Sequence, residues 1–198
     1  MIHSSAIVDS GAEVHPSASI WGSAQIRERA SIGSQSTIGG GAYIGVGVLV
    51  GSRVKIQNQA LVYEPAVIED GVFIGPGVVL TNDLYPRSIT PAGRLKAPSD
   101  WNAEGVHVGY GASIGAGAIC IAPIRIGKWS LVGAGTTVTS SVPDFALVLG
   151  NPARQVGWVG RTARRLIPGP ADSVWVCPDL GDVFRESNGS LELVEEVP

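Results

Sequence analysis

A six-residue repeat of aliphatic residues constrains this chain more than any other feature. From Ile2 to Leu80, every sixth residue is isoleucine, valine or leucine, without exception. A second series of mostly small residues lies two positions earlier, from Ala6 to Val78. An α-helix requires a period near 3.6 and a simple strand a period of 2, so neither explains the pattern. A period of six predicts an all-β protein, a parallel β-helix in which each hexad makes one short strand and one turn.

The repeat stops after Leu80 and resumes at Val108, from where it continues to Val138. The gap of 28 positions is not a multiple of six, so the repeat returns out of phase. We therefore predict one long loop, residues 81–107, extruded from the β-helix. A loop of this length in a stacked fold is usually functional or disordered, and polar and charged residues are concentrated in this one. We favour a function, and the alternative is a solvated excursion that covers a neighbouring subunit.

The boundaries that follow are a β-helix over residues 1–143, a closing segment with a basic stretch over 144–166, and a small C-terminal appendage over 167–198. Residues 183–187 and 190–194 flank an Asn-Gly pair, which predicts a β-hairpin in the appendage. The 27 glycines among 198 residues suit a fold with many tight turns.

Composition excludes several classes of protein. The net charge is −3 and no long basic run is present, which argues against nucleic-acid binding. Two cysteines, Cys120 and Cys177, are too few for a disulfide framework, and Cys120 falls on an inward position of the repeat, where we expect it to be buried. The N-terminus lacks the pattern of a signal peptide, and no stretch is long enough to span a membrane. We therefore expect a cytoplasmic protein without membrane contact.

Several motifs resemble those of a known enzyme family. The segment SVPDFALVLGNPARQVGW, residues 141–158, resembles the segment that closes the prism in left-handed β-helix acyltransferases that use acetyl-CoA. The motifs KIQNQALVY (55–63), GVFIGPGVVLTND (71–83) and PRS (86–88) are similar to those of bacterial sugar N-acetyltransferases. That family acts on UDP-2-acetamido-3-amino-2,3-dideoxyglucuronate and related nucleotide-linked amino sugars. The resemblance covers about residues 2–165.

The resemblance implies a left-handed parallel β-helix that assembles as a homotrimer, with active sites between subunits. It also implies transfer of acetyl from acetyl-CoA to the amine of a UDP- or dTDP-linked amino sugar, on a route to a surface polysaccharide. Flat prism faces suit cyclic packing, which is the only physical support for the trimer at this point.

The loop and its end contain the candidates for the groups that acetyl transfer requires. An amine with a pKa of about 8 is partly neutral at cellular pH, so a polar group that orients it can suffice. A hydroxyl acceptor depends more on a positioned base. The resemblance implies the orienting role for Asn82. Asp83 is a second catalytic candidate, with a turn acceptor as the alternative reading, and His107 is the reserve candidate for a base, with a structural role as its alternative.

A nucleotide-sugar acceptor requires cations for its diphosphate and polar groups for its sugar. Arg87 is the candidate for a sugar carboxylate or phosphate contact, and Gln57, Asn58 and Tyr63 on the preceding coil are candidate hydrogen-bonding partners. Each of these residues also fits a turn, and Asn58 also fits a polar ladder between coils.

Acetyl-CoA requires a surface for its narrow pantetheine arm and cations for its phosphates. The candidates for the arm are the small residues Gly115, Ala116, Gly133, Ala134 and Gly135, which also suit tight turns. The candidates for the phosphates are Arg154, Arg161 and Arg164, for which a solvated segment is the alternative.

Two other functions stay open, and a third does not fit the sequence. An O-acetyltransferase of the same fold and a non-catalytic β-helix scaffold stay open, because a fold does not determine a function. A β-helical carbonic anhydrase binds zinc through three histidines, and the three histidines of this chain are in the wrong places. We therefore expect no metal.

Overall fold

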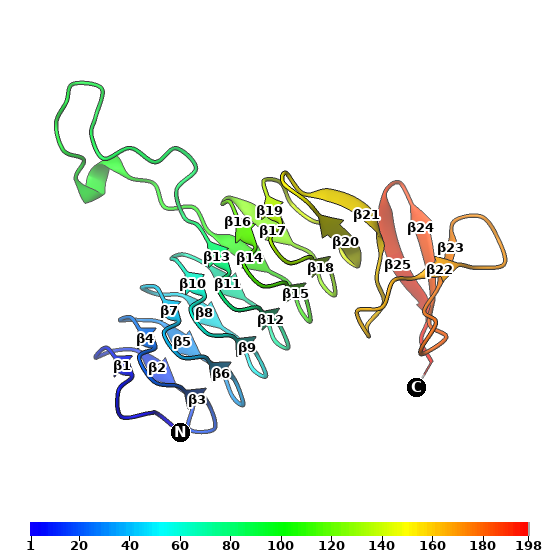
Figure 1. Cartoon of the computed structure of the whole chain (residues 1–198), viewed down its shortest axis with the longest axis horizontal. Helices are drawn as coiled ribbons and strands as arrows, with labels where there is room; N and C mark the ends of the chain where they lie inside the picture. The colour runs from blue at the N-terminus through cyan, green and yellow to red at the C-terminus, as the bar shows by residue number, and fades with distance from the viewer. Residues whose placement is uncertain (198) are drawn as a thin grey trace.

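The computed structural model describes residues 1–197 and shows a three-sided prism with a projecting loop and a small sheet at its C-terminal end (Figure 1). Consecutive short strands fall on successive faces, so each face is a parallel sheet whose neighbouring strands lie one coil apart. The first face contains β1 (Ile7–Val8), β4 (Gln25–Ile26), β7 (Tyr43–Ile44), β10 (Leu61–Val62), β13 (Val79–Leu80), β16 (Ile119–Cys120) and β19 (Thr137–Val138). The second face contains β2 (Glu13–Val14), β5 (Ser31–Ile32), β8 (Leu49–Val50), β11 (Val67–Ile68), β14 (Val106–Val108) and β17 (Ile124–Ile126).

The third face extends beyond the predicted end of the repeat. It contains β3 (Ser19–Ile20), β6 (Thr37–Ile38), β9 (Lys55–Ile56), β12 (Phe73–Ile74), β15 (Ser113–Ile114), β18 (Leu131–Val132), β20 (Ala146–Leu149) and the antiparallel β21 (Arg154–Trp158). Strand β20 pairs in parallel with β18, so the stack continues to Leu149, within the segment predicted to close the prism. This is the parallel β-helix that the six-residue repeat predicts.

The core explains why the repeat is so strict. From Ile20 to Val138, every residue of the aliphatic series is at most 4% exposed. Each points into the prism and packs between the equivalent residues of the coils above and below, so a polar residue here would be buried. Cys120 is fully buried as predicted, and burial raises the pKa of its thiol to about 12. Ser36, in the companion series, satisfies its hydroxyl by donating to the carbonyl of Gly51 at 2.8 Å.

The prism has three corners, which we name by what they carry. The loop corner, between the first and second faces, contains residues 63–66, the projecting loop and residues 121–123. The aromatic corner, between the second and third faces, contains residues 109–112, 127–130 and 143–145. The small-residue corner, between the third and first faces, contains residues 57–60, 115–118 and 133–136.

The loop occupies residues 81–105, because β14 begins at Val106 (Figure 1). Val67 pairs with Leu49 in the coil before it and with His107 in the coil after it, so the loop is one insertion within a single coil. The backbone N–H of Glu104 donates to the carbonyl of Asn82 at 3.3 Å and closes the root of the loop. Its outer part contains a bridge between Ile89 and Leu95 and the 3-10 helix η1 (Pro98–Asp100).

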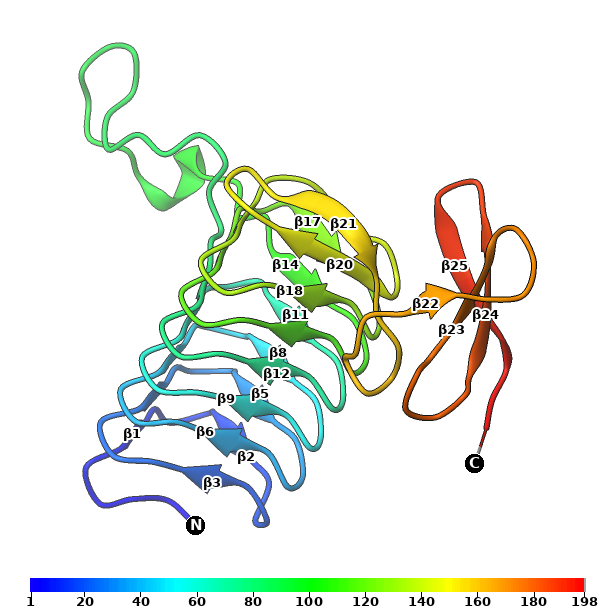
Figure 2. The ribbon, with the colours of Figure 1, turned by 45° about the vertical axis from the view of Figure 1, so that its right-hand side comes forward.

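The C-terminal appendage is an antiparallel sheet docked on the end of the prism (Figure 2). It contains β22 (Ile167–Pro168), β23 (Val174–Val176), β24 (Val183–Ser187) and β25 (Ser190–Glu195). Strands β24 and β25 form the predicted hairpin, with positive φ angles at Asn188 and Gly189 that suit this turn. Phe184 is buried and contacts Phe145 of the aromatic corner edge-to-face, at 5.1 Å between ring centroids. Within residues 1–197, no helix has the length and apolar character needed to cross a membrane.

Candidate active site

Asn82 lies at the first step of the loop away from the prism. Val62 pairs with Leu80 across the first face, and this register places Asn82 one coil above Glu64. Asn82 is half-buried, and its carbonyl oxygen accepts the hydrogen bond that closes the loop root. The residue predicted to orient the acceptor is therefore held by its backbone at a fixed point on the loop corner.

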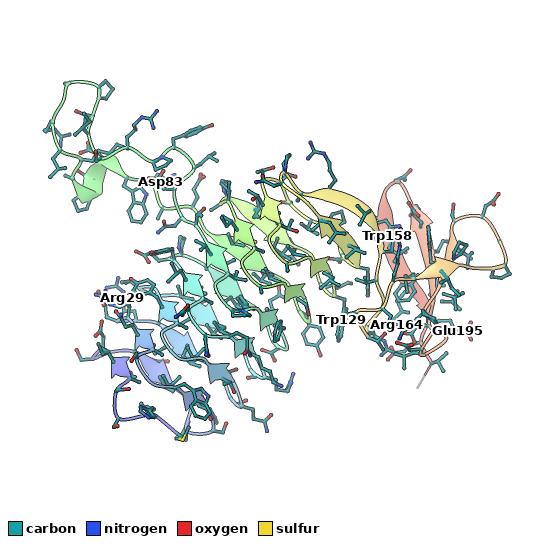
Figure 3. All side chains as sticks on the ribbon, viewed as in Figure 1. Arg29, Asp83, Trp129, Trp158, Arg164 and Glu195 are labelled. Atoms are coloured by element: carbon teal, nitrogen blue, oxygen red, sulfur yellow. The ribbon has the colours of Figure 1, made fainter. Side chains whose placement is uncertain are left out.

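Asp83 follows Asn82 where the loop leaves the prism (Figure 3). Its Oδ1 accepts a hydrogen bond from the backbone N–H of Tyr85 at 3.0 Å. This contact is the local turn that an aspartate commonly makes two residues ahead. The geometry therefore shows the turn role that was the alternative for Asp83.

His107 projects outward from β14 on the second face and belongs to a charged group. Its Nε2 lies 2.6 Å from Oε1 of Glu69, which follows β11, and 3.5 Å from a guanidinium nitrogen of Arg125 on β17. Glu69 also accepts the backbone N–H of Tyr110 at 2.8 Å. The hydrogen bond from His107 is the main cause that holds the pKa of Glu69 below its usual value, and Tyr110 adds to it. Glu69 thus orients the imidazole ring.

Sequence reasoning missed Glu69 and Arg125 as partners of His107. Glu69 lies far before His107 in the sequence, and the loop insertion hides the coil register that brings the two together. Removing the insertion from the count places His107 one coil above Val67, two residues before Glu69, and Arg125 follows His107 by one regular coil.

The structure divides the predicted acceptor-binding residues between two corners. Tyr63 lies on the loop corner, where its ring contacts that of Tyr43 at 5.3 Å between centroids. Gln57 and Asn58 lie on the small-residue corner, and β10 separates them from Tyr63. Oδ1 of Asn58 accepts the backbone N–H of Gly40, one coil below, at 3.1 Å. This is a polar contact between coils, as in the ladder that was an alternative for Asn58.

Two cations face one hollow on the loop itself. Arg87 and Lys96 line a space of about 500 Å³ together with Ile89, Thr90 and Pro91. Neither forms an ion pair with any other residue of the described chain. The nearby Arg94 differs, because its guanidinium lies 2.8 Å from Asp100. The backbone N–H of Ala97 and then Arg94 hold the pKa of Asp100 below its usual value.

The candidates for the pantetheine surface lie together on the small-residue corner. An added Cβ at Gly115 would lie 2.5 Å from the backbone N of Ala134, so the coils are packed too closely there for a side chain. Gly135 has φ +66° and no heavy atom within 4 Å of the position of an added Cβ. Ala116, Ala134 and Gly135 are exposed, so this corner presents an open surface of backbone and small side chains.

The predicted basic stretch does not form one patch. Arg161 is held by Asp182 at 2.9 Å and by Glu196, both in the appendage. Arg164 lies 3.6 Å from Asp179, and the exposed Arg154 donates to the carbonyl of Ala153 at 2.8 Å. Arg154 is thus the member of this group without a carboxylate partner among residues 1–197.

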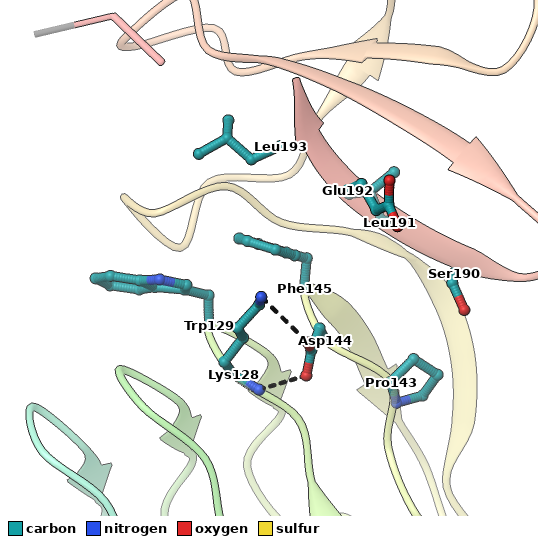
Figure 4. A pocket seen from close by; sticks show the side chains of 9 residues that line it. All are labelled: Lys128, Trp129, Pro143, Asp144, Phe145, Ser190, Leu191, Glu192 and Leu193. Carbon is teal, nitrogen blue, oxygen red and sulfur yellow. Dashed lines mark hydrogen bonds and ion pairs between the residues drawn. The ribbon is translucent and has the colours of Figure 1, made fainter. Parts of the chain in front are cut away.

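A further hollow of about 570 Å³ lies between the aromatic corner and β25 (Figure 4). Lys128 and Asp144 lie 3.6 Å apart on its prism side, beside Trp129 and Phe145, and Leu191 is on the opposite side. None of the predicted site residues lines it, and it lies on a different corner from the loop. Among residues 1–197, no group of three His, Cys, Asp or Glu side chains is placed to hold a metal ion.

Comparison with known families identifies the repeats. The family described as bacterial transferase hexapeptide (six repeats) matches residues 47–82, and the hexapeptide repeat of succinyl-transferase matches residues 29–64 and 105–140. The two stretches of the second match lie on either side of the loop. The chain therefore carries the hexapeptide repeats of bacterial transferases, which form the β-helix described above.

Individual proteins match shorter parts of the chain. The dTDP-3-amino-3,6-dideoxy-alpha-D-galactopyranose 3-N-acetyltransferase of Aneurinibacillus thermoaerophilus is 48% identical over 56 residues, 28% of this chain and 29% of that protein. A galactoside O-acetyltransferase of Lactococcus lactis is 35% identical over 81 residues, 41% of this chain and 37% of that protein. The chain thus spans less than half of the length of these relatives. A Bacillus cereus protein described as an acetyltransferase shares the fold, with TM-score 0.61 and 21% identity over 80% of this chain and 88% of that protein.

Proposed function

We propose that this protein is an acetyl-CoA-dependent N-acetyltransferase that acts on the amine of a UDP- or dTDP-linked amino sugar, in the synthesis of a surface polysaccharide. The observation that carries the proposal is the interruption of the prism at the loop corner. It presents Asn82, Tyr63 and the cations of the loop beside an otherwise regular surface. The match to a dTDP-amino-sugar N-acetyltransferase supports the acceptor class.

In this proposal each group has a separate task. The Asn82 amide orients the neutral amine toward the thioester carbon of acetyl-CoA, so that the reactants are held in position for attack. Arg87, together with Lys96, binds the diphosphate of the nucleotide. The open surface around Gly135 holds the pantetheine arm, and Arg154 is the cation left available for a CoA phosphate.

We further propose that the active unit is a homotrimer. Gln57 and Asn58 lie on a different corner from Tyr63 within one chain, and a neighbouring subunit could bring its small-residue corner to the loop. Outward-facing Ile119 on the first face and Leu49 on the second are 40% and 50% exposed in the single chain. Burial of such residues on flat faces favours cyclic packing.

O-acetyl transfer is the second candidate, and one observation favours it. The pair of His107 and Glu69 has the arrangement of a histidine base oriented by a carboxylate, which a hydroxyl acceptor requires. The match to a galactoside O-acetyltransferase is consistent with this alternative.

The acceptor class is tested by turnover. The purified protein is incubated with acetyl-CoA and a panel of UDP- and dTDP-linked amino sugars, and the release of free CoA thiol is followed. Each amino sugar is paired with the nucleotide sugar that has a hydroxyl at the same ring position. We expect turnover with at least one amine and none with its hydroxyl counterpart. Turnover with hydroxyl sugars alone would establish O-acetyl transfer, and no CoA binding at all would favour a scaffold.

The catalytic roles are tested by two single substitutions. We expect Asn82→Ala to lower kcat/KM for the amino sugar by about 100-fold, the effect of removing one positioned polar group. We expect His107→Ala to lower it by less than about 10-fold, because an amine is already partly neutral. Full loss with His107→Ala together with near-normal turnover of Asn82→Ala would contradict the scheme. Thermal unfolding of both variants controls for folding.

A further inference from the structure

Strand β25 (Ser190–Glu195) is a free edge of the appendage sheet. It is the longest strand among residues 1–197, and it pairs with β24 alone. Alternate residues of an antiparallel strand direct their backbone groups to opposite sides, so half of the N–H and C=O groups of β25 point away from β24. Within the described part of the chain, no backbone hydrogen bond from another element reaches residues 190–195. This strand can therefore accept a further strand.

The opposite edge of the same sheet is protected against such pairing. Strand β22 has two residues, and one of them is Pro168, which has no N–H to donate. Short edge strands and prolines are features that prevent association between sheet edges. Strand β25 has six residues and no proline. The open edge of the appendage is thus a property of β25 alone.

The hollow of about 570 Å³ described above lies along this open edge (Figure 4). Four consecutive residues of β25, Ser190 to Leu193, line it. Consecutive residues of a strand point to opposite faces, so a space lined by four of them lies at the edge of the strand and not over one face alone. A fifth strand added to β25 would therefore enter the hollow.

Two aromatic residues line the prism side of the hollow in an uncommon backbone conformation. Trp129 has φ +55° and Phe145 has φ +61°, whereas Gly71 and Gly111 occupy the same turn in the two coils below Trp129. A bulky residue with positive φ calls for a specific reason. Phe145 is buried against Phe184, which supplies that reason. The ring of Trp129 lies against Gly111 and is only partly buried, so it remains available to a ligand.

Charge distinguishes the appendage from the prism. Residues 167–198 contain seven Asp or Glu residues and one basic residue, Arg185, so their formal net charge is −6. The whole chain has −3, which leaves +3 on residues 1–166. On β25, Glu192 and Glu195 are exposed and neither forms an ion pair within the described residues, although Arg185 lies opposite Glu192. Like charges opposite each other destabilise paired strands, so a basic strand suits this edge and a second copy of β25 does not.

We propose that β25 and the hollow beside it form a docking site for an extended basic segment of another protein. The segment joins the appendage sheet as a fifth strand, and its backbone pairs with the free N–H and C=O groups of β25. On one face its apolar side chains enter the hollow beside Trp129 and Leu193, and on the other its lysine or arginine side chains lie next to Glu192. The site lies on a different corner from the loop, and the inference does not depend on the proposed function.

The test uses the full chain and a fluorescein-labelled octapeptide in which lysine and valine alternate. Fluorescence anisotropy measures its affinity, and hydrogen exchange followed by mass spectrometry locates it. We expect saturable binding and slower exchange of the amides of residues 190–195. A second peptide has proline in place of valine, which keeps the charge but removes N–H groups, and we expect it not to bind. A third has glutamate in place of lysine and should bind at least about 10-fold more weakly.

Two substitutions test the surface itself. We expect Glu192→Lys to weaken binding of the lysine peptide by about 10-fold. The matched control Asp172→Lys makes the same change of charge on an exposed loop of the same sheet, and it should change the affinity by less than about 3-fold. Trp129→Gly restores the residue found in the coils below and should fold, while it weakens binding by about 10-fold because an aromatic contact is lost.

Four outcomes would overturn the inference. One is the absence of saturable binding by the lysine peptide, and another is equal binding of the proline peptide, which would show attraction between charges alone. A third is wild-type affinity in both Glu192→Lys and Trp129→Gly, which would place the peptide elsewhere. The fourth is protection of residues 190–195 that grows with protein concentration when no peptide is present, because a second copy would then occupy the edge.

Discussion

At the residue scale, the glycines of the small-residue corner differ in whether they leave space for a side chain. Gly115 has backbone atoms of the next coil where a side chain would lie, whereas Gly135 has free space and a left-handed backbone. Asparagine is among the non-glycine residues that adopt this backbone most readily. Gly135 is therefore a position where a side chain can be added over the proposed pantetheine surface without a steric clash.

We expect Gly135→Asn to fold and to raise KM for acetyl-CoA by about 10-fold or more, because the new amide stands where the arm would lie. Steady-state kinetics with varied acetyl-CoA measures this effect. The matched control is Gly11→Asn, which has φ +85° and the same free space but lies in the first coil. Equal KM values for the two variants would remove the small-residue corner from the cofactor site.

The two thiols give a second prediction at this scale. Cys120 is fully buried and Cys177 is 1% exposed, and burial raises the pKa of Cys120 to about 12. The thiolate is the reactive form. We therefore expect no rapid reaction of the native protein with Ellman's reagent at pH 8, and reaction of both thiols in denaturant. The variant Cys177→Ala separates the two, and a fast thiol in this variant would contradict the burial of Cys120.

At the element scale, the appendage depends on a buried ion pair. The carboxylate of Asp182 is fully buried, and Arg161 binds both of its oxygens at 2.9 Å. The hydrogen bond from Arg161 is the main cause that lowers the pKa of Asp182 from its ordinary value of 3.8. A lowered pKa in the folded state stabilises the fold above the ordinary value, and this contribution is lost as the pH falls through the folded value.

We expect Asp182→Asn to destabilise the appendage at pH 7 by on the order of 3 kcal/mol, because it leaves Arg161 without its buried partner. The destabilisation should shrink as the pH falls below 3.8, where the unfolded carboxylate becomes protonated, and should be smallest below the lowered pKa of the folded carboxylate. Tryptophan fluorescence reports the transition, since Trp158 and Trp175 both donate to Glu186. The exposed pair of Asp179 and Arg164 provides the control, and Asp179→Asn should cost less than about 1 kcal/mol. Equal effects of the two substitutions would contradict this account.

At the scale of the whole molecule, the loop is an addition to an intact prism. Deletion of residues 83–104 joins Asn82 to Gly105, which are already close because Glu104 bonds to Asn82. Val108 then follows Leu80 at the regular spacing of the repeat. We expect this deletion to retain the midpoint of thermal unfolding within a few degrees and to abolish turnover, although Asn82 and His107 remain.

Deletion of residues 83–103 is the control for the register between the coils before and after the loop. It leaves one extra residue, which moves the later coils out of register with the earlier ones. We expect this variant to be clearly less stable, as measured by circular dichroism on heating. Turnover by the variant that lacks residues 83–104 would show that the loop is dispensable for catalysis.

The fold was predictable from the sequence because each coil repeats one physical requirement. An inward position must be aliphatic or small, so the repeat marks every strand from Ile20 to Val138 as well as the point of interruption. The site was less predictable, because its contacts link residues that belong to no motif. Glu69 meets His107 only through the coil register that the insertion obscures. Arg161 was predicted from charge alone, and its partner Asp182 belongs to the appendage.

The closed root of the loop has a consequence for how this kind of protein can diversify. An insertion whose ends are hydrogen-bonded neighbours imposes no constraint on the coils that carry it, so it can be lengthened, shortened or replaced with little effect on folding. Grafting the loop of another β-helix protein between Asn82 and Gly105 would thus exchange the part that we propose to bind the nucleotide, while the core stays the same. The range of acceptors in such proteins can then change by replacement of this one loop, without any change to the β-helix.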